Sequence, residues 1–88
     1  MLQTMTVMLS EGEHQLLTEV RMPDRLRQLI QCARQLPHAW QLDLSEDEAD
    51  ELQDFCGDML LAIGFDEHYE PNREGLILER LIDKFFTR

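Results

Sequence analysis

Carboxylates are the side chains that could carry chemistry in this sequence. Eighteen Asp and Glu stand against eight Lys and Arg, which gives a net charge of −10, and residues 46–70 contain ten acids and no Lys or Arg. Paired carboxylates act as general acid and base only where a pocket separates their pKa values. Helical spacing instead puts Asp47, Asp50 and Asp54 on one solvated face, so we predict a binding surface and no catalytic residues.

The sequence lacks the residue spacings that are typical of metal sites and of catalytic nucleophiles. The histidines His14, His38 and His68 stand far apart, and no CxxC or HExxH spacing occurs. A calcium loop counted from Asp66 would place Pro71 and Ile77 where glycine and glutamate are required. We therefore expect no metal site, no cofactor and no enzymatic activity.

Acidity is concentrated in the second half of the chain. Residues 1–44 hold four basic and five acidic side chains, whereas residues 45–88 hold four basic and thirteen acidic ones. This balance argues against binding to nucleic acid or to an anionic membrane, because both require Lys and Arg. The acidic run is either a solvated face that keeps the protein soluble or a surface for a basic protein partner. We favour the partner, and the predicted contact residues are Asp47, Asp50, Glu51, Asp54, Asp58, Asp66, Glu67, Tyr69 and Glu70.

Four helices are predicted. Ser10 and Ser45 are each followed by Glu three residues later, the spacing of a capping box, and are expected to begin helices over about 11–20 and 46–63. A further helix is expected over 24–36, ending before Pro37, and a last one after the N-cap Asn72. The helix over 46–63 is expected to turn a core face inward, formed by Ala49, Leu52, Phe55, Cys56, Met59, Leu60 and Ile63.

Two segments favour extended structure. Residues 38–44 alternate apolar and polar side chains, and they need residues 4–9 as a pairing partner to form a strand. The expected fold is mainly α, a single-domain bundle of about four helices over 1–88 with one short two-stranded β element. The wide apolar stripe of the last helix either completes the shared core or forms a homodimer seam.

Cys32 and Cys56 are both predicted on the apolar sides of helices, as reduced thiols of a cytoplasmic protein, with a single disulfide as the alternative. We find neither a signal peptide pattern nor an apolar run that could span a membrane. Arg21, Arg25, Arg27 and Arg34 are expected to pair with acids in the domain or to meet an acidic patch on a partner. Trp40 is expected either in the core or as an interface anchor.

The segment LSEDEADELQDFCGDMLLAIGFDEHYEPNREGLILERLIDKF combines an acidic helix, a GFDxxY turn, an xEG step and an LExLIDKF ending. In this half of the chain the sequence resembles the immunity proteins of bacterial polymorphic and contact-dependent growth inhibition toxins. It departs from that pattern at Pro71-Asn72, where a Leu-Thr-like pair is expected, and residues 1–40 carry no resemblance.

The resemblance implies a cytoplasmic, non-enzymatic inhibitor that binds one cognate toxin, often a basic nuclease domain. Two other functions stay open from the sequence. One is a homo-oligomeric structural or regulatory protein, and the other is an acidic mimic of nucleic acid that blocks a DNA-binding protein.

Overall fold

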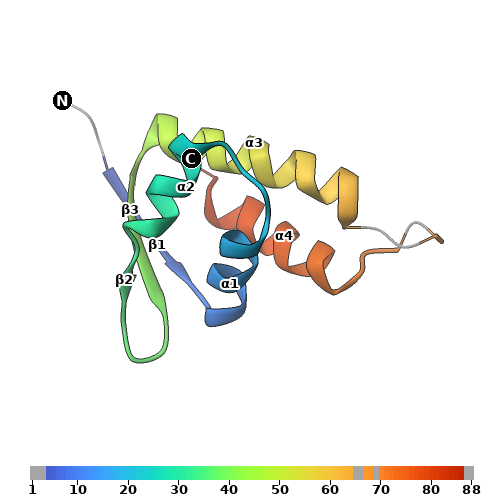
Figure 1. Ribbon diagram of the computed structural model, residues 1–88, viewed down its shortest axis with the longest axis horizontal. Coiled ribbons are helices and arrows are strands. Elements are labelled where there is room, and N and C mark those ends of the chain that lie inside the picture. The colour runs from blue at the N-terminus through green and yellow to red at the C-terminus, as the bar shows by residue number, and fades with distance from the viewer. Residues whose placement is uncertain (1–3, 65–66, 69, 87–88) are drawn as a thin grey trace.

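The structure, a computed structural model, describes residues 4–64, 67–68 and 70–86. Helices surround one side of a small sheet (Figure 1). In chain order the elements are β1 (Thr4–Leu9), α1 (Glu11–Glu19), α2 (Asp24–Gln31), β2 (Arg34–Gln35), β3 (Trp40–Ser45), α3 (Glu46–Ile63) and α4 (Arg73–Lys84).

The sheet is antiparallel, with the strand order β1-β3-β2. β1 pairs with β3 along its whole length, from Thr4 opposite Ser45 to Leu9 opposite Trp40. The conditional prediction that residues 4–9 join the strand near residues 38–44 is therefore confirmed. Because side chains alternate along a strand, Val7 and Leu9 are buried under the helices while Thr4 and Thr6 are exposed.

The expected helical bundle is only partly correct. The chain is mostly helical, but its sheet has a third strand, β2, which forms a hairpin with β3. The helix predicted over 24–36 ends at Gln31. Arg34 and Gln35 pair with β3 instead of continuing the helix, and Leu36 donates its N–H to the carbonyl of Ala39 across the hairpin.

This early helix end also overturns the prediction for Cys32. Cys32 caps α2 and is exposed, whereas Cys56 is fully buried in α3, as predicted. Both thiols are free in the structure. Burial raises the pKa of the Cys56 thiol to about 12, so this cysteine is a packing residue and a poor nucleophile.

Both predicted capping boxes are present. The Ser10 hydroxyl accepts a hydrogen bond from the Glu13 N–H at 3.2 Å, and Glu13 Oε1 accepts one from the Ser10 N–H at 2.7 Å. Ser45 and Glu48 repeat this arrangement at 3.1 and 2.8 Å, which fixes the first turn of α3.

The core joins the inner face of the sheet to all four helices. Its fully buried members include residues from both long strands and from all the helices, namely Leu9, Leu17, Ile30, Leu42, Leu44, Leu52, Leu78, Leu81 and Phe85. None of the helices in the described part of the chain is both long and apolar enough to cross a membrane.

The turn between α3 and α4 is held by backbone contacts. Gly64 caps the C-terminus of α3, and its carbonyl accepts a hydrogen bond from the Asn72 N–H at 2.8 Å. The Asn72 side chain caps α4 by accepting from the Gly75 N–H, also at 2.8 Å. Gly75 lies directly against Gly64, so the glycine of the xEG step is required for close approach of the two backbones.

Candidate partner-binding surface

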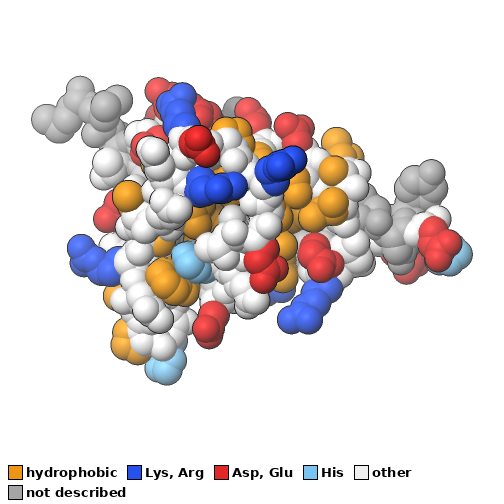
Figure 2. Space-filling view, viewed as in Figure 1, with side chains coloured by type: hydrophobic (Ala, Val, Ile, Leu, Met, Phe, Trp, Pro, Cys, Tyr) orange, Lys and Arg blue, Asp and Glu red, His pale blue; other side chains and the backbone are white. Residues whose placement is uncertain are grey.

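α3 presents most of the predicted contact residues on one face. Ala49, Leu52 and Cys56 turn into the core, and the opposite face carries a row of carboxylates spaced about one helical turn apart. This row, which we call the acidic ridge, consists of Asp47, Asp50, Glu51, Asp54 and Asp58. The four aspartates are exposed, and Figure 2 shows acidic side chains along the outer edge of α3.

The ridge is long and firmly placed. An 18-residue helix spans about 27 Å. The Ser45 capping box holds the first turn of α3. Farther along this helix, the Gln53 side chain donates a hydrogen bond to the carbonyl of Ile82 on α4 at 3.2 Å. A partner would therefore meet carboxylates that are already in position.

Glu51 forms an ion pair within the domain. Its carboxylate is half-buried and forms an ion pair with Arg25 on α2. The distance between Arg25 Nη2 and Glu51 Oε1 is 2.9 Å. The expectation that an arginine of the second helix pairs with an acid inside the domain is confirmed for Arg25. Glu51 is thus already neutralised, which leaves the ridge less negative than the sequence alone indicates.

The loop part of the predicted surface is only partly visible. Glu67 and Glu70 are exposed. Asp66 and Tyr69 lie outside the described residues, so their predicted contact role stays a prediction. The structure therefore brings together the five helical carboxylates of the predicted surface.

An apolar end of the ridge was missed by the sequence analysis. Leu61, three residues after Asp58, is 79% exposed, and on the core side Ile63 is 40% exposed although it was predicted in the core. Leu76, at the start of α4, is 51% exposed. The signal for Leu61 was present in the sequence, since its spacing from Asp54 and Asp58 places it on the ridge face and not on the core face.

Trp40 lies between its two predicted environments. It is half-buried at the start of β3, and its ring stacks on His14 of α1 with centroids 3.7 Å apart and planes 2° apart. Burial lowers the pKa of His14, so the neutral imidazole is favoured in this stack. The contact joins α1 to the sheet and has the character of packing.

Outside the ridge, Glu13 is a buried carboxylate that is paired with a lysine. Glu13 is 2% exposed, and its Oε1 lies 2.6 Å from Lys84 Nζ. The same ammonium donates a hydrogen bond to the carbonyl oxygen of Met8 at 2.8 Å. Because Glu13 also caps α1, its oxygen is fully used by structural contacts, and we assign it no reactive role.

The described residues contain no group of three or more His, Cys, Asp or Glu side chains arranged to hold a metal ion. Comparison of the chain with protein-family models, curated proteins and solved structures finds no match. The functional argument therefore depends on the surface itself.

Proposed function

We propose that the protein is a non-enzymatic inhibitor of the immunity-protein kind, which neutralises a basic toxin domain by binding it through the acidic ridge. The observation that carries this proposal is the row of exposed aspartates along one face of α3. Like charges at i and i+4, such as Asp54 with Asp58, each cost a few tenths of a kcal/mol in the free protein. A basic partner would relieve that repulsion.

The mode of inhibition follows from the charge. A toxin that cleaves nucleic acid needs a basic groove for the phosphate backbone. The ridge would occupy this groove or a neighbouring basic surface, and the long-range attraction would accelerate association at low salt. The exposed Leu61 at the end of the ridge would add an apolar contact that salt does not screen.

The homodimer is less favoured by the fold. The apolar stripe of α4 that suggested it is largely used within the chain, because Leu78, Leu81 and Phe85 are fully buried. A nucleic-acid mimic would also bind a basic protein through the ridge, so only the identity of that partner distinguishes the mimic from the inhibitor.

The test is affinity capture with the purified protein from cells of the source organism at about 50 mM salt, where charge attraction is weakly screened. A salt gradient elutes bound proteins for mass spectrometry. Recovery of one basic toxin domain at a 1:1 ratio, whose activity the protein then blocks when both are purified, is the expected result. Recovery of a DNA-binding protein would replace the toxin by the mimic hypothesis, and recovery of the protein alone would contradict both.

Two charge-reversal variants test the surface. Asp54→Lys combined with Asp58→Lys changes the ridge, and Glu79→Lys combined with Asp83→Lys makes the same charge change at exposed positions of α4. We expect the ridge variant to associate with the partner at least about tenfold more slowly than the α4 variant at low salt. Equal rates in the two variants would remove the ridge from the interface.

A further inference from the structure

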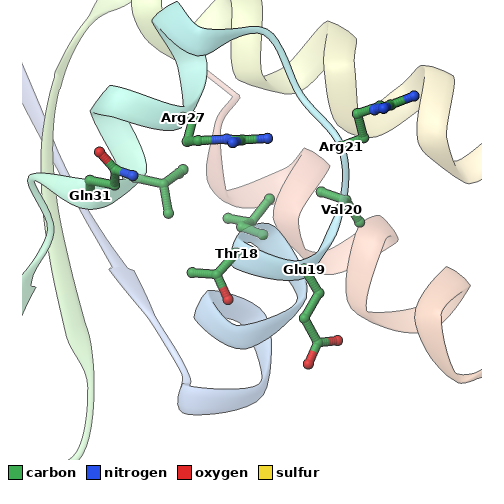
Figure 3. A pocket seen from close by; sticks show the side chains of 8 residues that line it. Thr18, Glu19, Val20, Arg21, Arg27 and Gln31 are labelled. Carbon is green, nitrogen blue, oxygen red and sulfur yellow. The ribbon is translucent and has the colours of Figure 1, made fainter.

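The hollow between α1 and α2 does not select a ligand. It is lined by exposed polar side chains such as Thr18, Glu19 and Arg27 (Figure 3), and Leu17 and Ile30 beside them are buried in the core. The free edge of the sheet offers a more specific pattern of hydrogen-bonding groups.

β1 is an edge strand of the sheet. The strand order β1-β3-β2 leaves one side of β1 without a neighbouring strand in the described part of the chain. Its sequence, TMTVML, contains no charged residue and no proline. Charged residues and proline are among the usual means by which proteins prevent an edge strand from pairing with another chain. This edge is therefore open to the addition of a strand.

The hydrogen-bond pattern shows which backbone groups face the free side of β1. Along an antiparallel pair, residues whose backbones bond each other alternate with residues whose backbones do not. Because Leu36 bonds Ala39 across the hairpin, the next residue of β3, Trp40, turns its backbone groups toward β1 instead. The alternation along β1 then directs away from the sheet the N–H and C=O groups of Thr4, Thr6 and Met8.

Lys84 supports this assignment and covers only one end of the edge. Its Nζ donates a hydrogen bond to the carbonyl oxygen of Met8 at 2.8 Å, which requires that carbonyl to face away from β3. A carbonyl oxygen can accept a second hydrogen bond, so the Met8 carbonyl stays available. Thr4 and Thr6 are exposed, and among the described residues no side chain donates to their carbonyl groups.

We propose that β1 pairs antiparallel with β1 of a second copy of the chain, about a two-fold axis at Thr6, and so joins two three-stranded sheets into one. In this register Thr6 faces Thr6 of the second copy and Thr4 faces Met8 of the second copy. Each outward N–H group then meets a carbonyl group. This interface is independent of the acidic ridge, and it differs from the α4 seam, whose apolar residues are largely used within the chain.

The distribution of charge favours a second copy as the partner of β1. The chain carries a net charge of −10, but the paired strands would bring no charged side chains together. The nearest charged side chains of the joined sheet, Asp43 of each copy, would be about 14 Å apart, since three strand spacings of about 4.8 Å separate them. This distance exceeds the Debye length of about 8 Å at physiological salt. Because one pair of short strands is smaller than a standard interface, we expect dissociation at about 100 μM.

The test is sedimentation velocity of the purified protein from about 10 μM to about 1 mM, at about 50 mM and about 500 mM salt. We expect a dimer that tightens at high salt, because salt screens the repulsion between two acidic chains. Binding of a basic partner by the ridge would weaken with salt instead, so the two interactions are distinguishable. A protein that stays monomeric throughout would overturn the proposal and leave the edge to a strand of a different protein.

Amide hydrogen exchange followed by NMR locates the interface. The Val7 N–H is bonded to β3 in the monomer, whereas the Thr6 N–H faces away from the sheet. Dimerisation should therefore slow exchange at Thr6 by at least about tenfold and change exchange at Val7 much less. A dimer in which the Thr6 amide exchanges as fast as in the monomer would contradict pairing through β1.

Two variants of Thr6 separate backbone pairing from side-chain contact. Thr6→Pro removes the N–H group at the two-fold axis, and it leaves the bonds to β3 in place because that group faces outward. Thr6→Val keeps the N–H group and loses only the hydroxyl bond to Asp43. We expect Thr6→Pro to weaken the dimer by at least about tenfold and Thr6→Val to dimerise as the wild type does. Circular dichroism verifies that each variant folds, and an equal loss in both folded variants would overturn the proposal.

Discussion

The backbone of Gly75, in the first turn of α4, packs against the carbonyl group of Gly64, the residue that caps α3. No side chain lies between the two. A Cβ atom at Gly75 would overlap that carbonyl oxygen and lie 2.9 Å from the carbonyl carbon. The overlap is with backbone, which cannot rotate away as a side chain can.

Gly75→Ala should therefore destabilise the protein by about 1–3 kcal/mol, the usual range for overpacking. Urea denaturation followed by circular dichroism measures this loss. An alanine variant as stable as the wild type would show that α3 and α4 can separate without cost.

Gly57, in the middle of α3, should respond in the opposite direction. A Cβ atom there meets nothing within 4 Å, so alanine adds no clash. Because glycine in a helix interior costs about 0.5–1 kcal/mol relative to alanine, Gly57→Ala should stabilise the protein by that amount. The same urea experiment serves both glycines, and a loss of stability at residue 57 would contradict the open space.

The buried pair of Glu13 and Lys84 predicts a pH dependence. Burial by itself raises the pKa of the Glu13 carboxyl, but hydrogen bonds from Lys84 and Ser10 and the charge of Lys84 outweigh it, so this pKa lies below its ordinary value near 4.5. The unfolded chain then binds the proton more readily than the folded one. The stabilisation is present above about pH 4.5 and is lost as the pH falls through the folded-state pKa.

Lys84→Met should remove this contribution and leave the Glu13 carboxylate buried without its cation. A fully buried pair loses about 3–5 kcal/mol on such a change, and we expect about 1–3 kcal/mol here because Lys84 is partly exposed to water. Urea titrations between about pH 3 and pH 7 measure the effect. Adding Glu13→Gln to Lys84→Met should recover part of the loss, and a double variant no more stable than the single one would argue against an uncompensated charge.

The His14–Trp40 stack provides an optical readout of protonation. Trp40 is the single tryptophan of the chain, and burial lowers the pKa of His14 from 6.5. Its emission should change with pH at a midpoint below 6.5, and stability from this contact should be complete above that pH and fall below it. His14→Phe keeps an aromatic ring at this position and should abolish the titration; a transition that persists in this variant would come from another group.

The parts of the fold that could be predicted are those determined by the spacing of residues a few positions apart in the sequence. Serine and glutamate three residues apart have the spacing of a capping box, and both helices that carry it begin where expected. The end of α2 could not be read in this way, because Ala33 and Leu36 fit a helix as well as a hairpin and the choice is made by pairing with β3. Contacts such as Glu13 with Lys84 depend on how distant elements pack, which no spacing encodes.

The same distinction holds for the candidate surface, where features set by residue spacing could be predicted and features set by packing could not. The helical acids were predictable from their period, and four of them are exposed as expected. The ion pair that neutralises Glu51 and the exposure of Ile63 were not, since both depend on where neighbouring helices stop covering α3.

The tie between Lys84 and Glu13 has a consequence for how the protein is made. The two residues are 71 positions apart, and β1 likewise waits for β3, so β1 and α1 reach their partners only after these later elements have been translated. Until α4 has been translated, its binding site on α1 and α3 leaves apolar surface open to water and to other nascent chains. Burial of the apolar faces of α1 and α3 therefore waits for α4, the helix that covers them.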